Sequence, residues 1–161
     1  MKQFLRCHPS TLPNGSTENS EEPDVNLLIA SVVENHADHQ RARHFLNSAE
    51  RFYTTPTTQG GFLRFLTRPW KDELKREQPP RMTIAQAVET LREIIGSPQH
   101  AFLPDDETFT QVSLRSMSGH RQWTDAYLMQ IARKNGLRFA TLERKLDNMD
   151  DSRAPVLLVV P

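Results

Sequence analysis

The feature that most constrains the fold is an alternation of short apolar segments with segments of helical periodicity. Runs rich in β-branched and aromatic residues, such as RFYTT (residues 51–55) and RFATL (138–142), are separated by stretches whose apolar residues recur at helical spacing. Parallel strands need a long crossover connection, usually a helix, whereas antiparallel strands can be joined by a tight turn. The alternation therefore predicts an α/β fold with a short central parallel sheet, covered by helices on both faces.

Turn and capping residues set the expected limits of these elements. We expect Thr83 to begin one helix, Asp105 or Asp106 to cap another, and Asn135 with Gly136 to end a third. The charged, proline-bearing residues 70–81 are expected to form an exposed connection. The predicted helices cover residues 25–33, 37–46, 62–69, 83–95, 105–117 and 126–134, and the predicted strands cover 51–55, 100–103, 138–142 and 155–160.

The chain length and the N-terminal composition predict one domain preceded by a tail. A chain of 161 residues suits a single hydrophobic core. Residues 1–22 are rich in small and polar residues that offer little to bury, so ordering them would cost entropy without compensation. We expect a flexible N-terminal extension over residues 1–22 and one domain over residues 23–161.

Charge and cysteine content limit the possible partners and compartments. Twenty basic residues balance twenty acidic ones, so any RNA binding must come from a local group of cations. The single cysteine, Cys7, cannot form an internal disulfide, which suits a reducing compartment. No segment approaches the roughly 18 apolar residues of a membrane span. We therefore expect a cytoplasmic protein without a membrane partner.

Three acidic residues are expected to meet at one edge of the sheet. Asp24 precedes the first helix, Asp125 begins the helix over residues 126–134, and Glu143 follows the RFATL strand. Functional side chains of parallel sheets gather beyond the carboxyl ends of the strands. Carboxylates gathered there would repel one another unless a hard cation such as Mg²⁺ or Mn²⁺ were bound. The alternative is that both aspartates only cap their helices.

Other polar and aromatic residues have simpler interpretations. His36, His39 and His44 lie on the polar side of a predicted amphipathic helix without zinc-site spacing, so we interpret them as solvated. For Trp123, core packing is favoured over stacking on a nucleic-acid base. The cations that could contact RNA phosphates are Arg64, Arg121, Arg138, Arg144 and Lys145.

Four segments occur in the order found in VapC-like PIN-domain toxins. They are PDVNLLIAS (23–31), TTPTTQGGFLRFLTRP (54–69), HAFLPDD (100–106) and WTDAYLMQIARKNGLRFATLERKL (123–146). The resemblance covers nearly all of the chain from Pro23 to the C-terminus. It implies a PIN-like three-layer α/β/α sandwich with a central parallel sheet, and acidic residues that bind divalent metal for phosphodiester cleavage.

The resemblance also assigns roles to individual residues. Asp24 and Asp125 match acidic residues that ligate metal in the family, and Glu143 stands where the family usually has Asp. Asn26 and Thr124 match polar residues beside the ligands, and such neighbours orient carboxylates. We therefore expect Asp24, Asp125 and Glu143 to be both catalytic residues and metal ligands for Mg²⁺, with Mn²⁺ possible.

Gln59 departs from the family pattern. It stands in TTQGGFLR where the family commonly has Glu, so a neutral amide replaces a charge; we expect it beside the ligands with Asn26 and Thr124. Three carboxylates can still suffice, because Mg²⁺ often uses one or two protein carboxylates and several waters.

The resemblance implies two alternative functions. The first is a metal-dependent endoribonuclease toxin of a toxin–antitoxin pair, which cleaves tRNA or similar structured RNA, is inhibited by a small cognate antitoxin, and forms a homodimer. The alternative is a catalytically degenerate PIN-like module that binds RNA or an antitoxin without cleaving.

Overall fold

The computed structural model describes residues 20–112, 117, 119–144, 146 and 156–158. Five strands form one sheet in the order β5-β2-β1-β6-β7, and every neighbouring pair is parallel. The strands are β1 (Ser20–Pro23), β2 (Arg51–Thr54), β5 (His100–Phe102), β6 (Arg138–Thr141) and β7 (Val156–Leu158). The parallel sheet predicted from the sequence is confirmed.

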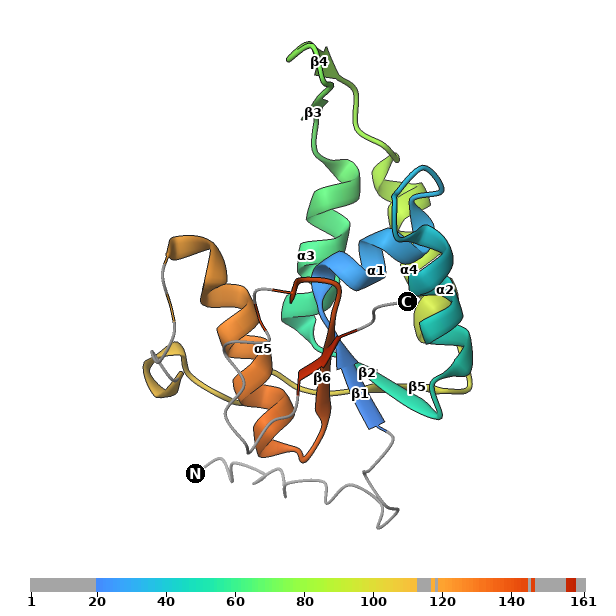
Figure 1. Cartoon of the computed structure of the whole chain (residues 1–161). Helices are drawn as coiled ribbons and strands as arrows, with labels where there is room; N and C mark the ends of the chain where they lie inside the picture. Colours follow the sequence, from blue (N-terminus) through green and yellow to red (C-terminus); the bar gives the residue numbers. More distant parts are fainter. Residues whose placement is uncertain (1–19, 113–116, 118, 145, 147–155, 159–161) are drawn as a thin grey trace, which may run out of the picture.

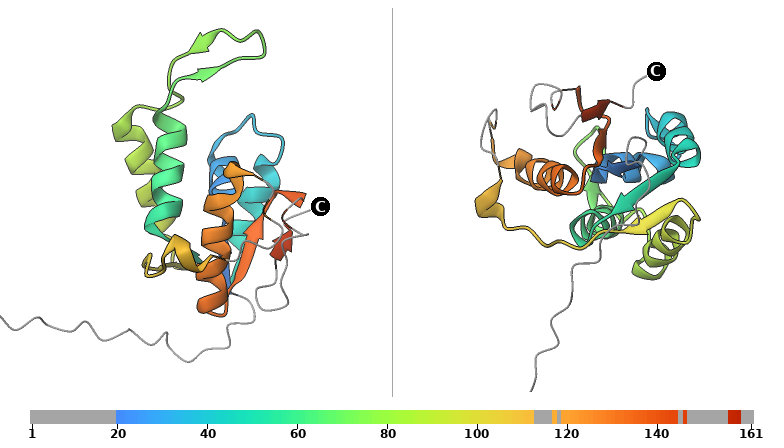
Figure 2. Two further views of the ribbon diagram at one scale, coloured as in Figure 1. Left: turned by 90° about the vertical axis from the view of Figure 1, so that its left-hand side faces the viewer. Right: turned by 90° about the horizontal axis from the view of Figure 1, so that it is seen from below.

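Helices cover both faces of this sheet (Figures 1 and 2). Helix α5 (Trp123–Lys134) packs on one face, where its apolar side chains meet Tyr53 and Phe139. On the other face lie α1 (Val25–Val32) and α2 (His39–Ser48), with Leu27, Ala30 and Ala42 against Ala140. Because Phe139 and Ala140 are consecutive strand residues, their side chains point to opposite faces. The three-layer α/β/α sandwich is therefore confirmed.

Two further helices pack beside α1 and carry a projecting hairpin. Helices α3 (Pro56–Thr67) and α4 (Ile84–Ile95) share a core with α1. Between them, β3 (Trp70–Lys71) and β4 (Glu77–Gln78) form an antiparallel hairpin that projects beyond the end of α3 (Figure 1). The predicted exposed connection over residues 70–81 therefore contains a short hairpin.

Local sequence accounts for the helix ends. Thr83 caps α4 through a reciprocal capping box with Gln86, as predicted. Thr55 caps α3, and Pro56 occupies its first turn, where a missing N–H costs nothing. Helix α3 therefore begins six residues earlier than the predicted start at residue 62. Gly136, with φ of 66°, follows α5 in the left-handed conformation that ends many helices.

The predicted helix over residues 105–117 is wrong over its described part. Only a short 3-10 turn, η2 (Phe109–Gln111), forms there, while residues 113–116 lie outside the described residues. The Asp105 carboxylate instead accepts hydrogen bonds from the Thr57 N–H (3.0 Å) and hydroxyl (2.7 Å) at the start of α3. Asp105 therefore stabilises the start of α3, which lies much earlier in the sequence.

The central strand β1 begins inside the segment predicted to be a flexible tail. Ser20, Glu21 and Glu22 are all buried between β2 and β6, so the predicted boundary between residues 22 and 23 is wrong by at least three residues. The Glu21 carboxylate pairs with Arg138 on β6. The Glu22 side chain is fully buried, and neither of its oxygens has a hydrogen-bond partner among the described residues. Burial, and secondarily Asp105, raises the pKa of Glu22 well above its usual range. Residues 1–19 lie outside the described part.

None of the described helices has both the length and the apolar character needed to cross a membrane.

Candidate active site

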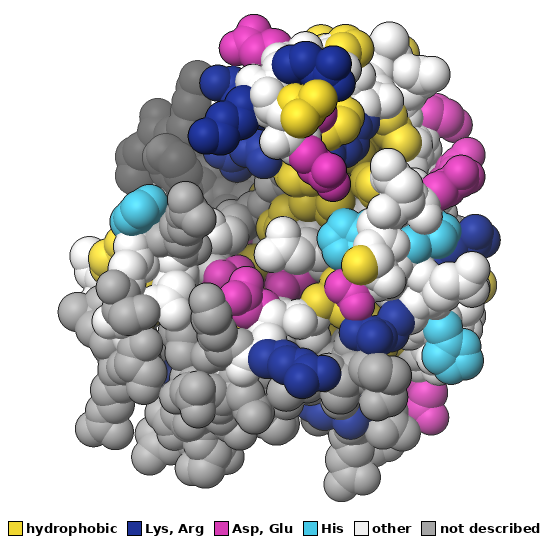
Figure 3. All heavy atoms as spheres, turned by 45° about the horizontal axis from the view of Figure 1, so that its top comes forward, with side chains coloured by type: hydrophobic (Ala, Val, Ile, Leu, Met, Phe, Trp, Pro, Cys, Tyr) yellow, Lys and Arg dark blue, Asp and Glu magenta, His cyan; other side chains and the backbone are white. Residues whose placement is uncertain are grey.

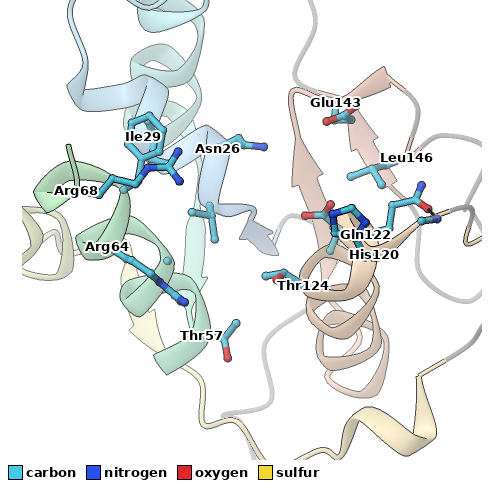
Figure 4. Close-up of a pocket in the computed structure, with 15 residues that line it drawn as sticks. Asn26, Ile29, Thr57, Arg64, Arg68, His120, Gln122, Thr124, Glu143 and Leu146 are labelled. Atoms are coloured by element: carbon cyan, nitrogen blue, oxygen red, sulfur yellow. Dashed lines mark hydrogen bonds between the residues drawn. The ribbon is translucent and has the colours of Figure 1, made fainter. Parts of the chain in front are cut away.

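A cleft of about 750 Å³ opens at the carboxyl ends of β1 and β6. Helices α1 and α3 form one side of it (Figure 4). The other side is formed by α5, the short turn η3 (His120–Gln122) that precedes it, and the segment after β6. The cleft therefore lies where the fold of a parallel sheet brings loops and helix starts together.

Asp24 is the most buried carboxylate at this edge. It follows β1 directly and caps α1, where its Oδ1 accepts a hydrogen bond of 2.5 Å from the Leu27 N–H. Its Oδ2 accepts one of 2.6 Å from the Thr141 hydroxyl. Its side chain is almost inaccessible, and this burial raises its pKa to about 6 although both hydrogen bonds lower it. Asp24 therefore does cap α1, and it is also a buried acid of raised pKa beneath the cleft.

Asp125 lies in the first turn of α5 and lines the cleft. Burial, and after it the charges of Asp24 and Glu143, together raise its pKa to about 7. The N-cap of α5 is Gln122, so Asp125 lies inside the first turn and not at the cap position. For Asp125, the simple capping interpretation is therefore not supported.

Glu143 completes the acidic group from the segment after β6. Its exposed side chain lines the cleft and raises the pKa of both aspartates by repulsion. The structure therefore brings Asp24, Asp125 and Glu143 together at one edge, as the sequence predicted. We call these three residues the carboxylate cluster.

Thr141 joins two members of this cluster, and sequence reasoning missed it. Its hydroxyl donates to Asp24 and accepts a hydrogen bond of 2.9 Å from the Glu143 N–H. Thr141 is the fully buried last residue of β6. The available signal was its position two residues before Glu143 at the end of a predicted strand, where polar side chains face a site.

The opposite side of the cleft is basic. Arg64 on α3 and Arg68 directly after it line the cleft, and they face Glu143, His120 and Gln122 across the opening (Figure 4). An acidic wall and a basic wall therefore share one cleft. This arrangement offers oxygen ligands for a cation and guanidinium groups for an anion.

The other residues predicted beside the ligands divide into two groups. Asn26 and Thr124 are exposed and line the cleft. Gln59 does not line it, because its side-chain amide donates to the Thr54 hydroxyl (3.0 Å) at the end of β2. Thr57, two residues earlier on α3, lines the cleft instead.

Several other sequence interpretations can now be assessed. Arg64 lines the cleft, but Arg138 is paired with Glu21 and is not free for phosphate. The side chains of Arg121 and Lys145 lie outside the described part. Trp123 is 42% exposed and contacts Phe109 edge to face. The prediction that Trp123 packs in the core is therefore wrong.

The donor chemistry of the carboxylate cluster fits a hard divalent cation. Within the described residues, no three His, Cys, Asp or Glu side chains converge closely enough to hold one ion together. The carboxylates are close enough to interact electrostatically, because the charge of Glu143 adds to the effect of burial in raising the pKa of both Asp24 and Asp125. Because Mg²⁺ commonly uses one or two carboxylates with several waters, a closed cage is not required.

The fold and the cleft define an α/β/α sandwich protein with an acidic site at the carboxyl edge of a parallel sheet. Comparison with known proteins gives the family. The PIN domain model matches residues 23–152, and the chain belongs to the PIN domain family.

Relatives and a solved structure agree with this assignment. The chain is 35% identical over 131 residues to "Ribonuclease VapC29" of Mycobacterium tuberculosis (strain ATCC 25618 / H37Rv), covering 78% of this chain and 87% of the relative. It is 33% identical over 122 residues to "Ribonuclease VapC38" of the same strain, with 74% and 82% covered. The crystal structure of the Mycobacterium tuberculosis sarcin-ricin loop cleaving toxin VapC20 matches with a TM-score of 0.55, at 16% identity, over 80% of this chain and 92% of that one. The resemblance to VapC-type PIN-domain proteins is confirmed.

Proposed function

We propose that this protein is a metal-dependent endoribonuclease and the toxin of a toxin–antitoxin pair, with tRNA or a similar structured RNA as its substrate. The observation that carries the proposal is the carboxylate cluster facing arginines across one cleft. The relatives are named ribonucleases, which supports RNA as the substrate class.

In this proposal, Asp24 and Asp125 hold a Mg²⁺ or Mn²⁺ ion, and Glu143 is the third acidic ligand, acting through a water molecule of the ion. When bound, the ion would polarise the scissile phosphate and activate a water molecule. Thr141 holds the Asp24 carboxylate in place through its 2.6 Å hydrogen bond, and Asn26 and Thr124 offer polar contacts at the rim. Arg64 and Arg68 bind the anionic chain on the opposite wall.

The raised pKa values give the site a defined pH response. A cation competes with protons for Asp24 and Asp125, whose pKa values are about 6 and about 7. Metal affinity and cleavage should therefore rise with pH through this range.

The test is cleavage of total cellular RNA by the purified protein with Mn²⁺, with Mg²⁺ or with EDTA, followed by sequencing of RNA 5′ ends. We expect discrete new ends that require metal and are absent for Asp125→Asn. The matched control is Asp106→Asn, which removes an exposed carboxylate that pairs with Lys134 outside the cleft. Intact RNA in every reaction, or equal cleavage by Asp125→Asn, would contradict the proposal.

The alternative is a degenerate PIN domain that binds without cleaving. Two observations favour it: both Asp24 oxygens already accept hydrogen bonds, and the neutral Gln59 points away from the cleft. It predicts RNA or antitoxin binding that survives Asp24→Ala, and no thermal stabilisation by Mn²⁺. A rise in Tm with Mn²⁺ that is lost in Asp125→Asn would exclude this alternative.

As proposed partners we retain a small cognate antitoxin and a second copy of the chain in a homodimer, in a cytoplasmic setting. Co-expression with the product of a neighbouring small open reading frame, followed by size-exclusion chromatography with light scattering, tests both. A monomeric chain that binds no such product would refute this part of the proposal.

A further inference from the structure

A group of arginines and aromatic rings extends the basic wall of the cleft onto the hairpin. Phe65 on α3 and Arg68 directly after it line the cleft, and the Arg68 guanidinium lies 5.0 Å from the centre of the Phe65 ring. Arg81, which follows the hairpin, lies 4.8 Å above the same ring and 4.4 Å above the ring of Trp70. We call Arg64, Phe65, Arg68, Trp70 and Arg81 the arginine ridge.

The ridge holds like charges close together without neutralising them. No carboxylate forms an ion pair with Arg64, Arg68 or Arg81 among the residues that the structure describes. Burial, and next the neighbouring Arg68, lowers the pKa of Arg81. Three unpaired guanidinium groups in a chain with no net charge form a local positive field.

The aromatic rings fix the orientation of the Arg68 and Arg81 guanidinium groups. A guanidinium stacked on a ring keeps its N–H groups at its edge, where they can donate to a phosphate. Stacking also restricts a side chain that would otherwise lose much rotamer freedom on binding. Figure 3 shows Lys and Arg side chains gathered around hydrophobic ones at the top of the molecule, where a few acidic side chains lie among them, and a further acidic group nearer the middle of the view.

We propose that the arginine ridge binds the phosphates of single-stranded RNA next to the cleavage point and aligns the strand across the cleft. The proposal rests on the ribonuclease function proposed above. RNA is favoured over an acidic protein segment because the ridge is continuous with the cleft through Phe65 and Arg68, and that cleft must hold the scissile phosphodiester. Arginines beside aromatic rings are also a common surface for single-stranded nucleic acid.

The ridge arginines occupy positions that a bound strand can reach from the carboxylate cluster. Arg64 lies in the last turn of α3, Arg68 is the residue that follows the helix, and both line the cleft. Arg81 is brought beside them by the hairpin, although it lies thirteen residues later in the sequence than Arg68. The hairpin therefore has a role in placing Arg81, which the sequence alone did not indicate.

The experiment measures binding of the native full chain to a fluorescein-labelled single-stranded RNA oligonucleotide in EDTA, by anisotropy, between about 50 and 200 mM salt. Each of Arg64→Gln, Arg68→Gln and Arg81→Gln should weaken binding severalfold. Each should also reduce the slope of log affinity against log salt by about 0.7, the value for one lost phosphate contact on a single strand. Arg92→Gln, on α4 outside the ridge, is the matched control and should change neither quantity.

Two further variants test the role of the rings. Trp70→Leu keeps every charge but frees Arg81, so we expect a severalfold loss of affinity with an unchanged salt slope. Arg81→Lys keeps the charge and loses the planar stacked group, and should behave in the same way. Loss of affinity that follows charge alone, with native binding by both variants, would overturn the positioning role of the rings.

The same variants separate this inference from the ribonuclease proposal. If the native chain binds RNA through the ridge but never cleaves it with Mn²⁺, the nuclease proposal fails and the ridge stands. If it cleaves, the Gln variants should raise KM more than they lower kcat. Unchanged RNA affinity and salt slope in all three Gln variants would overturn the ridge proposal. Binding of labelled polyglutamate to the same variants is measured in parallel. If the Gln variants lost affinity for polyglutamate and kept their affinity for RNA, the ridge would bind an acidic protein partner, and the ridge proposal would again be overturned.

Discussion

The Thr141 hydroxyl offers the sharpest test of how the carboxylate cluster is held. Thr141→Val keeps the shape of a fully buried side chain but removes the donor to Asp24 and the acceptor for the Glu143 N–H. Without that donor, the pKa of Asp24 should rise above its present value of about 6. The variant therefore destabilises the ionised form of Asp24 more than the protonated form.

The expected size of the effect depends on pH. A hydrogen bond to a neutral group contributes about 0.5–1.5 kcal/mol, and one to a charged group about 1.5–3 kcal/mol. At about pH 5, Asp24 in the folded metal-free protein is largely protonated, so Thr141→Val should lower the free energy of unfolding by about 1 kcal/mol. At about pH 8, Asp24 is ionised and the loss should be about 1 kcal/mol larger, since a pKa rise of one unit corresponds to about 1.4 kcal/mol.

The assay is urea denaturation in EDTA at both pH values. Thr58→Val is the matched control, because Thr58 is also fully buried but its hydroxyl lies 3.1 Å from the neutral Thr55 hydroxyl. Its loss of stability should be the same at both pH values. If the loss for Thr141→Val were equally independent of pH, the assignment of Thr141 as the group that stabilises ionised Asp24 would be refuted.

Three further predictions concern stability, and urea denaturation in EDTA measures each. Gly61→Ala should lower the free energy of unfolding by about 1–3 kcal/mol, because the added Cβ would lie 2.8 Å from a Val25 side-chain atom. Gly60→Ala should raise it by up to about 1 kcal/mol, because a Cβ there meets nothing within 4 Å. Equal effects of the two variants would contradict the close approach of α1 and α3. Asp125→Asn should stabilise by roughly 1–3 kcal/mol at about pH 8 and have little effect at about pH 4, because a raised pKa removes stability as pH rises; a pH-independent effect would exclude the pKa of about 7. Glu22→Leu should stabilise by about 1 kcal/mol or more at about pH 8, and a lower stability there would show that the buried carboxylate has a partner.

The helices and strands that the sequence could predict are those with local signals. Thr83 with Gln86 and Gly136 after α5 are caps whose chemistry is contained in a few adjacent residues. The carboxylate cluster was predictable for a related reason. Asp24 and Asp125 each stand at the start of a helix, and parallel topology places such positions at one edge.

Strand β1 was not predictable because nothing local favours it. Its residues, SEEP, have neither apolar alternation nor strand propensity, so pairing with β2 and β6 on both sides imposes its conformation. The helix expected over residues 105–117 failed for the converse reason. Asp105, a good N-cap, is recruited by Thr57 across the chain.

The position of Gln59 was missed because a helix face depends on exact phase. Thr57, Gly61, Arg64 and Arg68 are spaced by four, three and four residues, which places them on one face of α3 toward the cleft. Gln59 is two residues from this series and turns toward Thr54. A motif match gives the position in the sequence, but the side chain that enters the cleft follows from helix rotation.

Because of the order of the strands, the site can form only after β6 has been synthesised. Strand β1 lies at the centre of the sheet and pairs with β6, so Glu21 meets Arg138 across 117 residues. The ribosome releases the N-terminal half first, so β1 and Asp24 leave the ribosome before β6, the second strand that pairs with β1. A chain interrupted before residue 138 lacks Thr141 and Glu143 and leaves one side of β1 unpaired. A product that ends before residue 138 should therefore be inactive, and the proposed nuclease could act only after β6 and Glu143 have been synthesised.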